Sequence, residues 1–263
     1  MADAPKVLIA GESWTTHSTH VKGFDSFQTS TYAEGGTDMI ASIRGGGYDV
    51  TYQPSHIAAE QFPSTEKDMA AYRAIILSDI GANTLLLPAP SFIRSQRAPA
   101  NRLALMRDFV ANGGGLLMVG GYMTFQGIEG KANYRGSPVE DVLPVTLFAG
   151  DDRSERPEGV VPSVLKPDHE VMRGLPAEWP FFLGYSRSTA RPDATVVATI
   201  GGDPFIALRS VGKGRSAIFS SDCGPHWGPP GFIGWGREPG DDMEQPGRAY
   251  RDFWRNLVKW LCG

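Results

Sequence analysis

Polar side chains that can exchange protons or hold a metal follow the apolar runs of this 263-residue sequence. Histidine and carboxylate side chains titrate near enough to neutral pH to act as acids or bases, and two histidines can ligate a divalent metal. The candidates of this kind, with the aromatic and amide residues beside them, are Glu12, Trp14, His17, His20, Lys22, His56, Asp79, Asn83, Tyr122, Asp222, Cys223, His226 and Trp227. Four of the five histidines are in this set, which predicts one functional site.

His226 is the residue that we expect at the centre of this site. It lies in the segment Gly-Pro-His-Trp-Gly-Pro-Pro, whose prolines restrict the backbone and would hold the imidazole in one place. A fixed imidazole suits a general base or a metal ligand. Asp79 and Glu12 are the further catalytic candidates, although an aspartate directly after an apolar run can also cap a helix or form a turn.

His17 and His20 are three residues apart in a polar segment, 12–30, that we expect to be a loop. Two histidines at this spacing can ligate a divalent metal together with Asp79 or His226, or they can bond backbone groups within the loop. No other feature of the sequence predicts a cofactor. The substrate-binding candidates are Trp14, His17, His20, Lys22, Asn83, Asp222 and Trp227, and the two tryptophans can either wall a pocket or pack in the core.

Cys223 lies three residues before His226, a spacing that permits a thiol–imidazole pair. A free cysteine is more often buried and inert, and this segment lacks the sharp strand–turn–helix elbow that exposes a nucleophile. We therefore favour packing for Cys223. With Cys262 as the second cysteine, no disulfide framework is expected, and reduced thiols fit a cytoplasmic protein.

The elements that must position these residues follow from the apolar pattern. Short apolar runs ending in glycine or polar residues predict buried strands at 6–10, 48–53, 74–77 and 116–119, and helical spacing predicts helices at 32–44, 101–112 and 248–261. Three further runs, 195–200, 205–208 and 216–220, are joined by glycine turns and predict an antiparallel meander. We see no repeat or linker and expect a single domain, 1–263.

This alternation is typical of an α/β protein with a mostly parallel sheet, helices on both faces and an antiparallel β extension. Open parallel sheets bind ligands outside the carboxyl ends of their strands. Most of the polar candidates follow those ends, so we expect the site at that edge.

Composition excludes several classes of function. The net charge is −4 and no Lys/Arg cluster is present, so nucleic-acid binding is not expected. No apolar run approaches the roughly 18–20 residues of a membrane span, and the N-terminal run is too short for a signal-peptide core. No Gly-x-Gly-x-x-Gly follows the first predicted strand, so a nucleotide cofactor is not expected either.

Six segments together resemble the family named "putative glutamine amidotransferase", whose members are bacterial cytoplasmic proteins. They are VLIAGESW, HVKGFDSF, AIILSDIGANTLLLP, GGGLLMVGGYMTFQGIEGKANYRGSP, DHEVMRGLP and VGKGRSAIFSSDCGPHWGPP. The family is similar to the ThuA proteins and implies the flavodoxin-like fold of the class I glutamine amidotransferase-like superfamily. True glutaminases of the superfamily use a Cys-His-Glu triad, with the cysteine after the strand that corresponds to 116–119. Here Gly121 and Tyr122 stand there, and a tyrosine with a pKa near 10 does not replace a thiolate.

Two functions follow as hypotheses. In the first, the protein is an enzyme that converts a small polar metabolite by hydrolase- or isomerase-type chemistry, with His226, Asp79 and Glu12 as acid, base or ligand and Tyr122 orienting the substrate. In the second, it is a non-catalytic binding or structural module. A homo-oligomer is expected, with a surface formed by the aromatic residues Trp179, Phe181 and Phe182.

Overall fold

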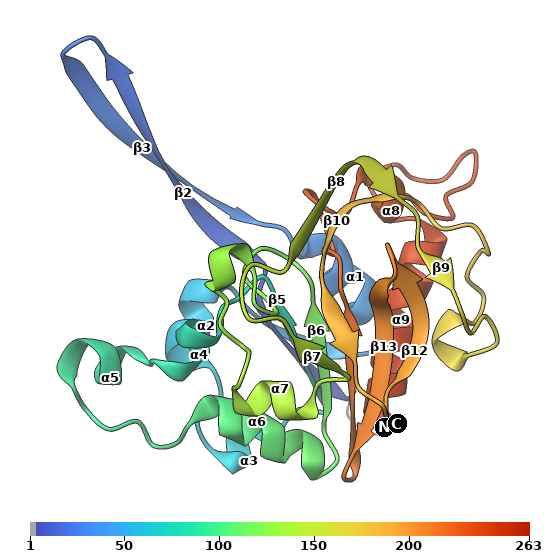
Figure 1. Cartoon of the computed structure of the whole chain (residues 1–263), viewed down its shortest axis with the longest axis horizontal. Helices are drawn as coiled ribbons and strands as arrows, with labels where there is room; N and C mark the ends of the chain where they lie inside the picture. The colour runs from blue at the N-terminus through green and yellow to red at the C-terminus, as the bar shows by residue number, and fades with distance from the viewer. Residues whose placement is uncertain (1–3) are drawn as a thin grey trace.

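The computed structural model describes residues 4–263, so residues 1–3 of the predicted domain lie outside the described residues. Figure 1 shows a layered body with a long hairpin projecting from it. The helices are α1 (Thr37–Arg44), α2 (Ser55–Gln61), α3 (Glu66–Met69), α4 (Ala82–Leu86), α5 (Ala89–Arg94), α6 (Arg102–Ala111), α7 (Pro138–Val142), α8 (Pro230–Ile233) and α9 (Arg248–Cys262), with 3-10 turns η1 (Ile128–Gly130) and η2 (Glu170–Met172).

An eight-stranded sheet forms the centre of the body. Its order is β4-β1-β5-β6-β14-β13-β12-β9, and its members are β1 (Lys6–Gly11), β4 (Asp49–Gln53), β5 (Ala74–Ser78), β6 (Gly115–Val119), β9 (Ser163–Val164), β12 (Thr195–Ile200), β13 (Asp203–Val211) and β14 (Gly214–Phe219). The first five strands in that order are parallel, and the last three continue the sheet antiparallel. Counted in chain order, the parallel strands follow 2-1-3-4-5, which is the flavodoxin order and confirms the predicted fold class.

Helices cover both faces of the sheet because its parallel strands are apolar on both sides. In β1, Val7 and Ile9 join the core that includes α1 and α9, whereas Leu8 and Ala10 join the core that includes α2, α4 and α6. These four side chains are fully buried. The near-continuous apolar runs seen in the sequence are therefore the signature of central strands with two covered faces.

Several predicted elements are confirmed almost to the residue. α6 begins as expected, because the Asn101 side chain accepts hydrogen bonds from the backbone N–H groups of Leu103 (2.9 Å) and Ala104 (3.2 Å). α9 buries the predicted stripe that runs from Tyr250 to Leu261. The predicted helix over 32–44 is shorter, since it begins only at Thr37.

The prediction of a loop at 12–30 was wrong. Residues 13–34 form a hairpin of two ten-residue strands, β2 (Ser13–Lys22) and β3 (Asp25–Glu34), that projects away from the body (Figure 1). We call this hairpin the arm. It turns at Gly23, whose φ of 67° suits a tight hairpin turn with glycine at its first central position. β-branched threonines favour the extended conformation even though neither face of the arm is packed on the body.

The middle of the chain, between β6 and β12, adds two small antiparallel sheets, in which β10 (Phe182–Ser186) pairs with β8 (Arg153–Val160) and β11 (Ser188–Ala190) pairs with β7 (Val145–Leu147). The prediction that three aromatic residues of this region form an oligomer surface is wrong for two of them. Trp179 and Phe182 are buried in the core, and only Phe181 is exposed. Within residues 4–263, no helix is both long and apolar enough to cross a membrane.

Candidate functional site

A cleft of about 280 Å³ opens at the carboxyl ends of the parallel strands. It lies at the point where the strand order reverses, between β1 and β5, which is where doubly wound sheets bind their ligands. Glu12 follows β1, Asp79 follows β5, and Tyr122 follows β6. The cleft is lined by Glu12, Trp14, Asp79, Tyr122, Asp222, Pro225 and His226.

Three of these residues have a left-handed backbone. The φ angles of Glu12, Asp79 and His226 are 48°, 45° and 116°. Such conformations cost about 1 to 3 kcal/mol each in non-glycine residues and persist where the surrounding structure fixes them, commonly at functional sites. The backbone amide of Glu12 is held by the carbonyl of Ser78 at 2.6 Å, so β1 and β5 together fix the turn.

Glu12 is an acid of the cleft whose pKa lies far from its ordinary value. Its side chain is buried, and its Oε2 accepts a hydrogen bond from the Ser78 hydroxyl at 2.5 Å. Burial, and to a smaller extent the nearby charge of Asp79, together raise the pKa of Glu12 to about 7, against the lowering effect of the Ser78 hydrogen bond. Glu12 can therefore both donate and accept a proton near neutral pH.

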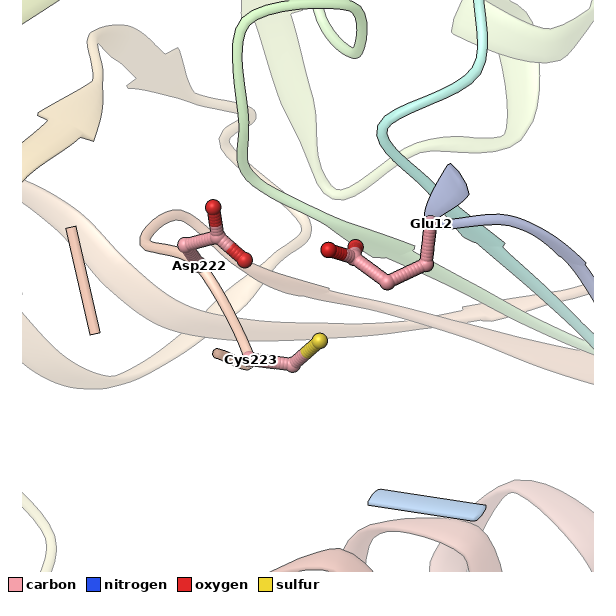
Figure 2. A group of neighbouring side chains, drawn as sticks. All are labelled: Glu12, Asp222 and Cys223. Carbon is pink, nitrogen blue, oxygen red and sulfur yellow. The ribbon is translucent and has the colours of Figure 1, made fainter. Parts of the chain in front are cut away.

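Asp222 and Cys223, on the segment after β14, lie beside Glu12 (Figure 2). A carboxylate oxygen of Glu12, a carboxylate oxygen of Asp222 and the Sγ atom of Cys223 lie within 4.8 Å of one another, and all three residues are buried. Burial and the charge of Glu12 raise the pKa values of the Asp222 carboxyl and of the Cys223 thiol well above their ordinary values. Cys223 is therefore a protonated thiol, which matches the packing interpretation rather than a nucleophile.

Asp79 holds the turn that carries Tyr122. Its Oδ1 accepts a hydrogen bond from the backbone N–H of Met123 at 2.7 Å. Burial raises the pKa of Asp79, while the Met123 hydrogen bond and the charge of His226 oppose the rise. A Cβ at Gly121 would lie 2.9 Å from Asp79 Oδ1, so a glycine is needed for this close approach.

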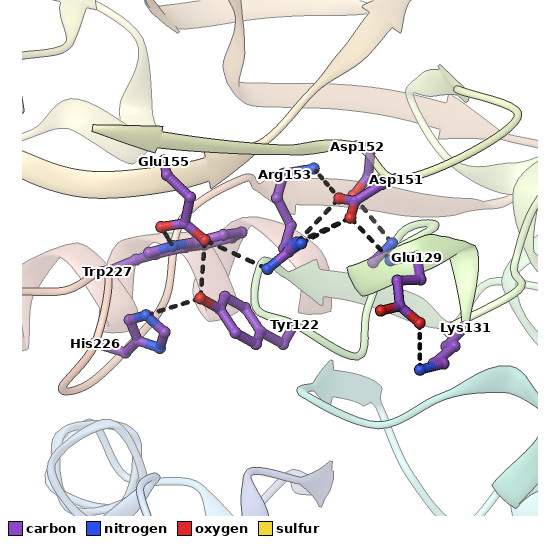
Figure 3. Close-up of polar contacts among 10 residues, drawn as sticks. Tyr122, Glu129, Lys131, Asp151, Asp152, Arg153, Glu155, His226 and Trp227 are labelled. Atoms are coloured by element: carbon purple, nitrogen blue, oxygen red, sulfur yellow. Dashed lines mark hydrogen bonds and ion pairs between the residues drawn. The ribbon is translucent and has the colours of Figure 1, made fainter. Parts of the chain in front are cut away.

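A chain of hydrogen bonds joins His226, Tyr122 and Glu155 (Figure 3). The Tyr122 hydroxyl donates to Glu155 Oε1 at 2.8 Å and lies 3.1 Å from His226 Nε2. Because the hydroxyl has one proton, which it gives to Glu155, it accepts from Nε2–H of the imidazole. The neutral imidazole then has its lone pair on Nδ1, which is the nitrogen free to take a proton.

Glu155 is held in place by two further neighbours. Trp227 Nε1 donates to Glu155 Oε2 at 3.0 Å, and Arg153 Nη1 lies 3.7 Å from Oε1. The Arg153 guanidinium also lies 4.9 Å from the centre of the Tyr122 ring. Burial and the hydrogen bond to Glu155 raise the pKa of Tyr122, so its hydroxyl stays protonated.

Sequence reasoning missed Glu155 and Arg153. Both are on β8, in the middle region whose segments have no clear apolar period. The only sequence feature that could have indicated them is the alternation of opposite charges at Asp151, Arg153 and Glu155. Such alternation is common on exposed strands, so it does not indicate a site. Trp227 is buried behind the cleft, where it binds Glu155, and Trp14 is on the cleft wall.

Besides Trp227, four predicted binding residues lie outside the cleft, and all four are exposed. His17, His20 and Lys22 are on the exposed arm, and Asn83 is on the exposed surface of α4. His56, on α2, is also exposed. The expectation that four histidines gather in one site was therefore wrong. His17 and His20 lie elsewhere because the segment after β1 leaves the sheet as a hairpin, and His56 is exposed on α2 and does not line the cleft.

The arm also separates His17 from His20. Residues three apart in a strand point to opposite faces. His17 Nδ1 lies 2.8 Å from the Ser30 hydroxyl on one face, whereas the His20 ring stacks on Phe27 on the other, with ring centres 4.5 Å apart. The two imidazoles therefore do not form a shared metal site with Asp79 or His226.

The description "Putative glutamine amidotransferase" belongs to the family model that matches residues 6–263. Cytoplasmic protein STM3548 from Salmonella typhimurium is 42% identical, and its structure superposes with a TM-score of 0.89 over 97% of this chain and 98% of that chain. Cytoplasmic protein STM1381 from Salmonella typhimurium LT2 is 41% identical, with a TM-score of 0.88 over 97% and 99%.

A more distant likeness concerns the fold alone. The structure described as a "Putative thua-like protein", from Bacteroides uniformis ATCC 8492, is 13% identical and superposes with a TM-score of 0.51 over 99% of this chain and 93% of that chain. Among curated proteins, none matches this chain.

Proposed function

We propose a function for this chain, which belongs to the "Putative glutamine amidotransferase" family. It binds a small polar metabolite in the cleft at the carboxyl ends of the parallel strands and converts it by acid–base chemistry. The observation that carries this proposal is that Glu12, Asp79 and His226, three groups able to move protons, line one cleft on strained backbone.

The proton roles of two of these groups, His226 and Glu12, follow from their environments. His226, with Nε2–H bound to Tyr122, has Nδ1 available as a general base. Glu12, whose pKa is about 7, is the group that returns a proton. Tyr122 and Glu155 are positioning residues, since they fix the tautomer and the ring rather than exchange protons with the substrate. A pair of titratable groups with different environments is the usual arrangement of an acid and a base.

Glutamine hydrolysis by a thiolate is not part of the proposal. Tyr122 occupies the position where the superfamily resemblance places the cysteine nucleophile, and its raised pKa keeps it neutral. Cys223, the nearest thiol to the cleft acids, is buried and protonated. Family membership therefore supplies the fold, and the cleft residues supply the chemistry.

The charge of the cleft indicates the kind of metabolite. Among the described residues that line it are three carboxyl groups and one histidine, but no lysine or arginine. A phosphate or carboxylate group would meet these acids with no cation to offset them, whereas hydroxyl and amine groups would find acceptors. A neutral or amino metabolite of monosaccharide size suits the volume of the cleft and fits hydrolase- or isomerase-type chemistry. The cytoplasm is the compartment that we propose for it.

Three probes of one ring size test this assignment. We expect saturation-transfer NMR to detect binding of glucose and glucosamine, and to detect none or much weaker binding of glucose 6-phosphate. At pH 8, above the pKa of about 7 of Glu12, Glu12→Gln should narrow the difference in binding between the phosphorylated and unphosphorylated probes. Glu60→Gln, at an exposed acid outside the cleft, serves as the control. Preferential binding of the phosphate ester would contradict the proposal.

A further inference from the structure

In a single copy of the chain, the described residues provide no further strand or covering element for the arm. Within the described residues, β2 and β3 pair only with each other and form a two-stranded sheet. An isolated hairpin is marginally stable in water, because neither face is covered by other elements. Nearly every residue of the arm is exposed. Its 22 residues correspond to one side of a standard protein–protein interface, which uses about 20 to 30 residues.

The tip of the arm exposes apolar side chains that would normally be covered. Phe24 is fully exposed at the turn, and Val21 is 71% exposed beside it. Along one face, His20 stacks on Phe27, whose ring also has Lys22 Nζ 5.7 Å from its centre. Contiguous exposed apolar groups of this kind mark interaction sites on soluble proteins.

A second apolar projection lies elsewhere on the same chain. The segment 87–97, which contains α5, stands out from the body on the same side as the arm (Figure 1). Phe92 and Ile93 on this segment are 74% and 73% exposed. In the structure the tip of the arm points away from this segment, so one copy does not bring the two together.

The charges of the two projections are complementary. The segment 87–97 contains Arg94 and Arg97 and no acidic residue, so its net charge is +2, whereas the arm has Asp25 and Glu34 against Lys22, a net charge of −1. Asp25 is the acid at the tip, next to Phe24, and Glu34 lies at the base of the arm, paired with Ser13. Opposite net charges favour this pairing over contact between two arms, which have net charges of the same sign.

We propose that the arm of one copy docks on the segment 87–97 of a second copy, with Phe24 and Val21 packed against Phe92 and Ile93. Exchange of arms in both directions closes the assembly with two-fold symmetry and covers both projections of each copy. The partner is therefore another molecule of this chain, and the arm is its principal contact.

Sedimentation and light scattering over a broad dilution series test the proposal. We expect the wild-type chain to self-associate, and Phe24→Asp and Phe92→Asp each to weaken association by about 30-fold or more, the effect of losing one hot-spot contact. Met243→Asp, at an exposed apolar residue outside both projections, should leave association unchanged. Circular dichroism checks that each variant is folded.

A cross-linking experiment identifies the two sides of the contact. Phe24→Cys mixed with Phe92→Cys should give an intermolecular disulfide under mild oxidation, whereas Phe24→Cys mixed with Met243→Cys should not. A wild-type chain that is monomeric at every concentration would overturn the proposal, and so would association that survives Phe24→Asp. Loss of association in Phe24→Asp but not in Phe92→Asp would overturn the assignment of the docking segment.

Discussion

The Tyr122 hydroxyl lies 3.1 Å from His226 Nε2, although the two residues are 104 positions apart in the chain. Tyr122 follows β6 and His226 follows β14, and these two strands are parallel neighbours in the sheet. The contact is therefore a direct result of topology, because the carboxyl ends of adjacent parallel strands meet at one edge. Glu155 completes the chain of hydrogen bonds from outside the central sheet.

Removal of the Tyr122 hydroxyl should lower turnover without altering substrate affinity. Tyr122→Phe keeps the ring that packs against His226 and Arg153 but frees Nε2–H, so the tautomer is no longer fixed. We expect kcat to fall about tenfold or more with little change in KM, within the range for general-base positioning. Glu155→Gln should act through the same chain, so the double variant should be no slower than the slower single variant. Additive losses would show that the two residues act separately.

Stability should decrease as pH rises from about 5 to 7, and Glu12 should account for part of the decrease. The pKa of Glu12 is raised from 4.5 to about 7 in the folded state, so above pH 4.5 the unfolded chain releases a proton that the folded chain retains. The corresponding loss of unfolding free energy is about 3 kcal/mol, complete once the pH exceeds 7. Urea unfolding of Glu12→Gln should show a flatter pH dependence than wild type, whereas Glu60→Gln should not. Equal slopes for wild type and Glu12→Gln would refute the assignment.

Asp79→Asn and Asp79→Ala should differ in stability. Asp79 has a φ of 45°, which asparagine tolerates and alanine does not, and it accepts the Met123 N–H. We expect the alanine variant to unfold about 1 to 3 kcal/mol more easily than the asparagine variant in urea. Asparagine retains a carbonyl oxygen for Met123 but removes the carboxylate, so it is the variant that tests function. Equal stability of the two variants would contradict the role of Asp79 in holding the turn.

The cysteines should not support glutaminase chemistry. Burial raises the pKa of the Cys223 thiol, and Cys262 has its pKa raised to about 11 by burial. We expect no ammonia release from glutamine and no mass increase after incubation with a glutamine-derived diazoketone that alkylates catalytic thiols. Cys223→Ala should retain binding of the sugar probes. A stoichiometric adduct on Cys223 would restore the nucleophile interpretation that we set aside.

Much of the fold could be predicted, because the apolar pattern of the sequence indicates which residues are buried. The runs at Val7–Ala10 and Ala74–Leu77 have no polar member because both faces of the sheet are covered, and Asn101 marks the start of α6 through its side-chain oxygen. The same logic placed Glu12, Asp79, Tyr122 and His226 at one edge, since each follows a parallel strand.

The arm and Glu155 were not predictable in this way. The strands of the arm bury neither face on the body, so they have no apolar alternation, and only their threonines favour an extended chain. This is why His17 and His20 were placed in the site. Glu155 is on β8, which ends at Val160 and pairs with β10, which begins at Phe182. No local sequence pattern predicts a pairing across the intervening residues 161–181.

The proposed function requires His226 to act as a base in the cleft at the sheet edge. Proton NMR of the protein incubated with neutral sugars, amino sugars and small amides, over a range of pH, tests this requirement. His226→Asn keeps a residue that tolerates the left-handed backbone, and His56→Asn is the matched control at an exposed histidine outside the cleft. We predict conversion of at least one compound near neutral pH, slowed about 100- to 10,000-fold by His226→Asn and unchanged by His56→Asn. Conversion that survives His226→Asn would show that His226 is not the base. A wild-type protein that neither binds nor converts any of these compounds would overturn the proposed function.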